Sequence, residues 1–197
     1  MPRGFTPTQS QAIRQKLLAF AYEKIADTGV RKTSVEMLAR AANISTGAFY
    51  KFYPSKEALF FEVYETLEDH LKEGFLKLLE TVPNGNLTAL KNVLSQLLAS
   101  DDMQRLFTLI RKEELDYLLM GIEPQLIQQH HKADLAYMNE VIQQLQKCDF
   151  PISADAELLV AYVQGLFILN FEKDQLQPNA ERVIETFLNA ILSDLIH

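Results

Sequence analysis

Apolar residues recur along most of this chain at intervals of three and four, the period of an amphipathic α-helix. No stretch alternates apolar and polar residues as a half-buried strand does. Most breaks between the periodic stretches contain Pro, Gly, Asn or Asp. Together they predict an all-α protein whose helices cover approximately residues 7–28, 33–42, 45–53, 55–81, 87–100, 103–119, 124–147, 154–171 and 178–196.

The segment TSVEMLARAANISTGAFYKFYPSKEAL, residues 33–59, predicts two short helices joined by a tight turn. Thr33 is expected to cap the first helix, with Glu36 completing a capping box. Asn43 is expected to end it, because Asn readily adopts the left-handed conformation of such a turn. Ser45 is expected to cap the second helix, whose first turn carries only small side chains and can approach a phosphate or a base edge closely. The segment therefore predicts a helix-turn-helix, and the alternative is a packed helix pair of some other all-α protein.

The same segment resembles the N-terminal domain of TetR-type transcriptional repressors. The matching residues are Gly29, Thr33, Ser34, Leu38, Ala39, Ile44, Ser45, Gly47, Phe49, Tyr50, Tyr53, Ser55, Lys56, Glu57 and Leu59. The family usually has Gly where Asn43 stands, and often His or Tyr where Phe52 stands. The motif covers about the first third of the chain, and the remainder resembles the family in length and helical character. We therefore expect a three-helix DNA-binding domain over residues 1–60 and a helical effector-binding and dimerisation domain over 61–197.

The resemblance implies DNA contacts by the residues at the matching and neighbouring positions. They are Thr33, Ser34, Ser45, Thr46, Gly47, Ala48, Tyr50, Lys51, Phe52 and Lys56. Five of them are expected to hold phosphates, namely Thr33, Ser34, Tyr50, Lys51 and Lys56, whereas Thr46 and Ala48 are expected to face base edges. Few of these side chains can hydrogen-bond to a base, so sequence preference is expected to depend on DNA shape.

The charges are distributed unevenly along the chain. The formal net charge is −7, yet residues 1–60 hold nine Lys and Arg against four Asp and Glu. The remaining residues hold ten basic against 22 acidic side chains. A basic end on an acidic chain would orient an encounter with DNA, although such asymmetry also arises by chance.

The last two predicted helices are apolar over a wide face, and the first of them is apolar in nearly every direction. We expect part of this surface to meet a second copy of the chain, as the resemblance also implies. The expected interface residues are Leu159, Tyr162, Val163, Leu166, Ile184, Phe187, Leu188 and Ile191. The alternative is a central core helix in a monomer.

The resemblance further implies a cavity for a small-molecule effector in the second domain. Candidate lining residues are Phe107, Arg111, Glu114, Tyr117, Leu118, Tyr137, Val141, Tyr162 and Phe167, which mix aromatic surface with polar groups of both signs. Aromatic residues at helical spacing are more often part of a core.

Enzyme motifs are absent from the sequence, and no cofactor or metal is expected. His130 and His131 are adjacent, so on a helix they point about 100° apart and cannot easily share one ion. Cys148 is the single cysteine, which excludes an intramolecular disulfide and is typical of a cytoplasmic protein. The N-terminus lacks the apolar core of a signal peptide, and no apolar run reaches membrane-spanning length.

These observations favour a homodimeric, ligand-responsive regulator, most simply a repressor, on a pseudo-palindromic operator. One alternative is an activator or a regulator without an effector. The other is a helical enzyme or ligand carrier without a DNA role.

Overall fold

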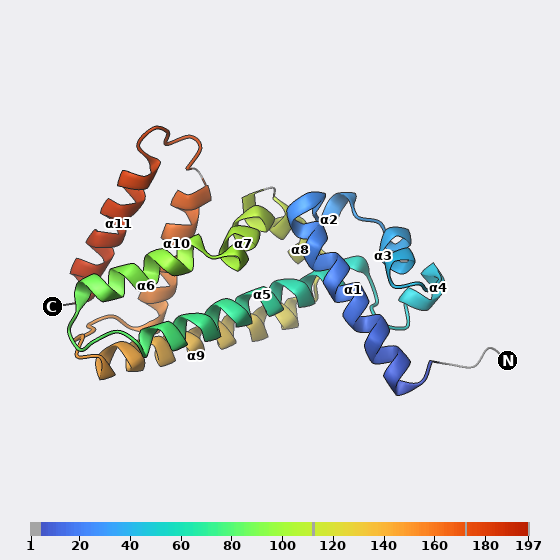
Figure 1. Cartoon of the computed structure of the whole chain (residues 1–197), viewed down its shortest axis with the longest axis horizontal. Helices are drawn as coiled ribbons and strands as arrows, with labels where there is room; N and C mark the ends of the chain where they lie inside the picture. Colours follow the sequence, from blue (N-terminus) through green and yellow to red (C-terminus); the bar gives the residue numbers. More distant parts are fainter. Residues whose placement is uncertain (1–4, 112, 172, 197) are drawn as a thin grey trace. The chain divides into compact units, whose positions relative to one another are not determined.

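The computed structural model of the chain describes residues 5–111, 113–171 and 173–196 (Figure 1). Across these ranges the chain forms helices and no strand, apart from one isolated bridge between Ile152 and Ile196. The helices are α1 (Pro7–Asp27), α2 (Gly29–Lys32), α3 (Val35–Ala41), α4 (Thr46–Phe49), α5 (Lys56–Leu79), α6 (Leu87–Ala99), α7 (Asp101–Arg111), α8 (Glu114–Met120), α9 (Pro124–Lys147), α10 (Ala156–Phe171) and α11 (Ala180–Leu195). The predicted all-α class is confirmed.

Both ends of α1 have residues that local capping chemistry favours. Thr6 caps the helix and forms a reciprocal capping box with Gln9, and Pro7 is the first helical residue. The helix ends at Asp27, and Gly29 follows with φ +78°. Gly29 thus stands directly after the C-cap residue Thr28 in the left-handed conformation that commonly ends a helix, as expected. It begins α2, a four-residue helix that the sequence pattern does not indicate.

The single helix predicted over 103–119 is two helices in the structure. Between α7 and α8, Glu113 has φ 53°, in the left-handed region that ends a helix. No Gly or Pro marks this break in the sequence. The reason is tertiary: Glu114, the first residue of α8, accepts a hydrogen bond from the backbone N–H of Arg31, 83 positions earlier.

The chain divides into two compact units, which are described separately. Unit 1 contains the residues up to Glu68 together with Thr108–Glu123. Unit 2 contains Asp69–Phe107 and the residues from Pro124 onward. The predicted division at residue 60 therefore differs from the structure, which groups residues 61–68 and α8 with the N-terminal helices.

Unit 1 is built around a core to which both its long and its short helices contribute. Fully buried side chains include Leu17 from α1, Leu38 from α3, Phe49 from α4, Leu59 from α5 and Leu118 from α8. Burying a side chain of this size stabilises the fold by about 1.5–3 kcal/mol. The short α3 and α4 therefore keep their positions through packing rather than through helical propensity.

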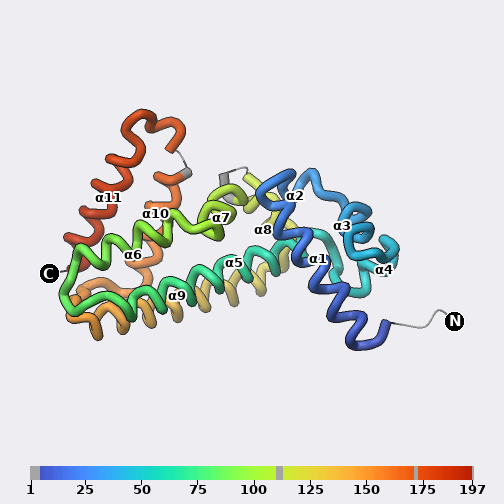
Figure 2. Tube along the Cα trace, viewed as in Figure 1, coloured from blue at the N-terminus to red at the C-terminus, as the bar shows by residue number. Residues whose placement is uncertain are grey.

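Unit 2 has its own core, to which the end of α5 and helices α6, α9, α10 and α11 contribute. The trace in Figure 2 shows α9 returning alongside the later part of α5. Lys72 on α5 pairs with Asp134 on α9 at 2.6 Å, and Tyr137 donates to the Lys72 carbonyl at 3.3 Å, which agrees with this arrangement. Cys148 is buried in this core, with Sγ 3.5 Å from the Leu79 carbonyl oxygen. Among the described helices, none combines the length and apolar character needed to cross a membrane.

Candidate nucleic-acid interface

The first helix of the predicted motif, α3, begins at Ser34 rather than at Thr33. The Ser34 hydroxyl accepts a hydrogen bond from the Met37 N–H at 3.2 Å. Thr33 cannot cap the helix because it is fully buried and its hydroxyl donates to the Gly29 carbonyl at 2.7 Å. Glu36 pairs instead with Arg40 at 3.1 Å, one turn further along α3. The predicted capping box is therefore wrong, because the cap is Ser34 and the residue three positions later is Met37.

The turn between α3 and α4 has the predicted conformation. Asn43 has φ 59°, and its N–H donates to the Arg40 carbonyl at 3.0 Å. The N–H of Ile44 donates to the Ala39 carbonyl at 2.9 Å, so the end of α3 is closed by backbone bonds. An Asn fits here because its short polar side chain tolerates a positive φ.

The recognition helix, α4, is capped by Ser45, whose hydroxyl accepts from the Ala48 N–H at 3.1 Å. Phe49 is fully buried and anchors the helix, whereas Tyr50 is 57% exposed. The regular helix ends at Phe49, and turn-type bonds continue the coil to Tyr53 in place of the longer helix predicted over 45–53. One buried aromatic ring thus anchors α4 and leaves the start of the helix at the surface.

The turn between α3 and α4 also borders a depression in the surface. A depression of about 450 Å³ lies between the end of α3 and the start of α4. It is lined by Glu36, Ala39, Arg40, Asn43, Ile44, Ser45 and Thr46. The residues at the start of the recognition helix therefore border open space rather than packed side chains.

Most of the predicted DNA-binding residues are accessible. Ser34, Ser45, Thr46, Gly47, Tyr50 and Lys51 are exposed, and Ala48 and Phe52 are half-buried. The Phe52 ring packs against Phe5, with 5.6 Å between ring centroids, and the Lys51 ammonium lies 6.0 Å from the same Phe5 ring. Phe52 therefore packs against a neighbouring aromatic ring, a role that needs no hydrogen-bonding group at this position.

Two predicted phosphate contacts are not supported by the structure. Thr33 is fully buried, so its hydroxyl cannot reach a phosphate. Lys56 directs its ammonium at three backbone carbonyls, those of Val30 (2.9 Å), Arg31 (3.1 Å) and Thr33 (3.1 Å). An ammonium has three N–H donors, and these bonds use all of them. Lys56 matches the family motif, but here its ammonium bonds the carbonyls of α2 and Thr33 within unit 1.

The predicted effector-lining residues divide between the two units. Phe107, Tyr137, Val141, Tyr162 and Phe167 belong to unit 2, whereas Glu114, Tyr117 and Leu118 belong to unit 1. The side chain of Arg111 lies outside the described part of the structure.

The residues of this set that lie in unit 2 pack in its core or contact neighbouring side chains. Phe107 and Phe167 meet edge to face at 5.5 Å, and Val141 lies in the core. The Tyr162 hydroxyl donates to Asp194 at 2.5 Å. The Tyr137 hydroxyl donates to the Lys72 carbonyl at 3.3 Å, and burial, followed by the charge of Glu140, raises the pKa of Tyr137 above its ordinary value of 10.0.

Glu114 and Tyr117 are used inside unit 1, which corrects their assignment to an effector cavity. The Glu114 carboxylate is buried and accepts from the Arg31 N–H at 2.9 Å. The Tyr117 hydroxyl donates to Glu57 at 2.8 Å. That hydrogen bond, followed by burial and by the charges of Glu57 and Glu114, raises the pKa of Tyr117 above 10.0. Sequence spacing cannot reveal either contact, because the partners lie 60 or more positions apart.

The predicted dimer-interface residues fall into two groups. Leu159, Leu188 and Ile191 are buried in the core of unit 2. Tyr162, Val163, Leu166 and Ile184 are half-buried, and Phe187 is 37% exposed. Other apolar side chains on the same two helices are more open, namely Leu158 at 41% and Ile168 at 64% exposed. Residue type along an apolar helix does not separate these groups, because the packing of α11 on α10 decides which side is covered.

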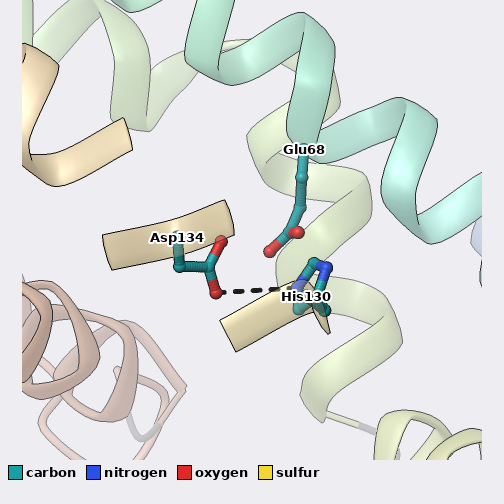
Figure 3. A group of neighbouring side chains, drawn as sticks. All are labelled: Glu68, His130 and Asp134. Atoms are coloured by element: carbon teal, nitrogen blue, oxygen red, sulfur yellow. Dashed lines mark ion pairs between the residues drawn. The ribbon is translucent and has the colours of Figure 1, made fainter. Parts of the chain in front are cut away.

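The adjacent histidines of α9 point in different directions, as expected. His130 lies against Asp134, with Nε2 3.7 Å from Oδ2 (Figure 3). His131 is exposed. Asp134 is also paired with Lys72 at 2.6 Å. The pairing is thus between positions four apart on one helix face, and the lysine already balances the carboxylate charge.

The capped turn, the buried anchor and the exposed recognition helix define a helix-turn-helix protein. A sequence profile described as "Bacterial regulatory proteins, tetR family" matches residues 17–63. The HTH-type transcriptional regulator AcrR of Shigella flexneri is 30% identical over 142 residues, which cover 72% of this chain and 59% of that protein. The match thus spans less than two thirds of that relative's length.

Two solved structures share the fold. A TetR-family transcriptional regulator from Pectobacterium atrosepticum is 18% identical with a TM-score of 0.64, covering 95% of this chain and 94% of that one. FadR of Thermus thermophilus, a TetR-family transcriptional repressor in complex with lauroyl-CoA, is 20% identical with a TM-score of 0.63 and covers 93% and 95%. Residues 17–63 thus resemble the DNA-binding segment of TetR-type regulators, and the chain shares the fold of TetR-family structures.

Proposed function

We propose that this chain is a transcription regulator that binds a pseudo-palindromic operator as a homodimer, represses transcription, and is released by a small molecule. The observation that carries the proposal is the surface around α4. Its first turn exposes small residues and free backbone, and Ser34, Tyr50 and Lys51 are exposed nearby in the chain. A helix start of this kind suits a major groove between two phosphate strands.

The proposed contacts divide by chemistry. Ser34, Tyr50 and Lys51 donate to phosphates and set the register of the protein on the duplex. Thr46 and Ala48 face base edges, with Ala48 against a thymine methyl group. Ser45 and Gly47 bring backbone close to the DNA. Thr33 and Lys56 support this surface from inside and make no contact with DNA.

Binding is tested by fluorescence titration of the purified protein against the promoter region beside its own gene, with a shuffled duplex of equal length as control. We expect tighter binding to the promoter DNA at every salt concentration, with affinity falling as salt rises. Equal binding to both duplexes, or none, would overturn the proposal. Transcription from that promoter with and without the gene then separates repression from activation.

The proposed dimer uses the exposed apolar sides of α10 and α11. Leu158, Ile168, Val183 and Phe187 are each at least 36% exposed, and water would be excluded from them by a second copy. Ile168→Glu and Phe187→Glu should therefore yield monomers in analytical ultracentrifugation, with loss of promoter binding. Glu185→Lys is the control, since this exposed α11 residue is already charged. Unchanged dimers in both apolar variants would exclude this face.

The proposed effector is taken up by unit 2, and its chemical class is open to a direct test. Because a fold relative holds lauroyl-CoA, medium-chain acyl-CoA is a suitable first probe. Binding that displaces promoter DNA should also raise the melting temperature, since a ligand of the native state stabilises it. An acyl-CoA that does neither excludes this ligand class.

A further inference from the structure

Helix α2 is held from both ends by charged side chains that come from other helices. It has four residues, too few to be stable alone. At its start, Glu114 of α8 accepts the Arg31 N–H at 2.9 Å. At its end, Lys56 of α5 donates to the Val30, Arg31 and Thr33 carbonyls. A carboxylate at the amide end and an ammonium at the carbonyl end match the helix dipole.

The Glu114 carboxylate fits this place closely. The residue is 6% exposed, and a buried carboxylate is unfavourable unless it is hydrogen-bonded. Gly29 lies against it with φ +78°, and a Cβ on Gly29 would be 2.6 Å from Glu114 Oε1. The glycine therefore supplies both the backbone conformation and the room that the carboxylate needs.

Tyr117, one turn along α8, joins the two ends of this arrangement. Its hydroxyl donates to Glu57, and its ring lies 5.3 Å from the Arg31 guanidinium and 5.4 Å from the Lys56 ammonium. Gly121 at the end of α8 packs so closely on Glu57 that a Cβ there would be 2.8 Å from the Glu57 Cγ. Helix α8 thus contacts α2 or the start of α5 at Glu114, Tyr117 and Gly121.

The chain leaves α2 directly into the proposed DNA-binding surface. Thr33 bonds back to the Gly29 carbonyl at 2.7 Å, and the next residue, Ser34, is exposed and caps α3. Any loosening of α2 therefore moves the N-terminal end of α3. The start of that helix is the part of a helix-turn-helix that meets the phosphate backbone.

We propose that Glu114 is a positioning residue for DNA binding: its carboxylate holds α2, and through α2 it holds Ser34 and the start of α3 in the arrangement that contacts the duplex. Helix α8 then contributes to DNA binding by holding α2, although it lies more than 60 residues beyond the helix-turn-helix in sequence. This inference rests on the proposed function.

The sign of the effect separates positioning from simple electrostatics. Removing a negative charge from a protein that binds a polyanion should strengthen binding. Loss of positioning should weaken it. Glu114→Ala is therefore expected to weaken binding about tenfold, the effect of losing one charge-assisted hydrogen bond that only the competent arrangement makes fully. Glu114→Gln keeps an acceptor for the Arg31 N–H and should lose only about two- to threefold.

The experiment measures affinity for a duplex that the wild-type chain selects from a random-sequence library, over a range of salt concentrations. Measurements are made at a temperature where circular dichroism shows every variant fully folded, so that lost stability alone leaves the affinity unchanged. Asp116→Asn is the matched control, because Asp116 is an exposed carboxylate on the same helix, α8. This control should bind as tightly as the wild type or more tightly.

Two further results complete the test. The slope of log affinity against log salt should stay unchanged in Glu114→Ala, because no phosphate contact is removed. Equal or tighter binding by folded Glu114→Ala would overturn the positioning role, and so would a flattened slope. Failure of the wild type to select any duplex would instead overturn the proposed function itself.

Discussion

Replacing Gly29 with Ala tests the fit between Gly29 and Glu114 as a change in stability. At φ +78°, an L-residue costs about 1–2 kcal/mol more than glycine. The added Cβ would also lie 2.6 Å from Glu114 Oε1, so the carboxylate must move away from the Arg31 N–H. Losing a hydrogen bond to a charged group costs about 1.5–3 kcal/mol. Gly29→Ala should therefore lower the free energy of unfolding by about 2.5–5 kcal/mol.

Urea unfolding followed by far-UV circular dichroism measures this loss, and two comparisons divide it into its parts. Gly85 also has a positive φ, +65°, but nothing lies within 4 Å of its added Cβ, so Gly85→Ala should cost only about 1–2 kcal/mol. In a Glu114→Ala background the steric part disappears, so Gly29→Ala should there resemble Gly85→Ala. Strict additivity of the Gly29 and Glu114 substitutions would refute the argued contact.

Three other outcomes follow from the structure. Gly74→Ala should raise the free energy of unfolding by about 0.5–1 kcal/mol, because Gly74 lies inside α5 with open space around its Cβ, and a loss in urea unfolding would contradict this. Lys51→Ala should lower the slope of log affinity for DNA against log salt by about 0.9, because it removes a phosphate contact. Lys56→Ala should weaken binding but keep the wild-type slope. Equal slopes in the two variants would contradict the roles assigned to the two lysines. The folded-state pKa of Tyr137 is raised, so its neutral phenol contributes to the free energy of unfolding. This contribution is complete below about pH 10 and is lost as pH rises through the folded-state pKa. Alkaline melting curves should therefore show a smaller loss for Tyr137→Phe than for the wild type, and parallel losses would argue against it.

Local patterns along the chain determine most of the elements and the motif. The capping box at Thr6, the left-handed Asn43 and the cap at Ser45 each depend on side chains within four positions of the backbone that they serve. Such interactions need only neighbouring residues, so residue type and spacing can predict them. The capping box at Thr33 is the exception, because the fold buries its hydroxyl. The helical period likewise identifies the all-α class, and the family motif identifies the helix-turn-helix.

Tertiary structure alone decides the roles of the charged and hydroxyl side chains at the edge of that motif. Thr33 and Lys56 match the family motif, yet one is buried and the other bonds three carbonyls. Glu114 is a polar residue of a kind that lines ligand cavities, yet its carboxylate accepts a hydrogen bond from a backbone N–H that is 83 positions away in the chain. A long flexible side chain can meet partners from any element that packs nearby. The sequence therefore shows which groups are available, and only the packing of α8 and α5 around α2 determines which of them remain free to contact DNA.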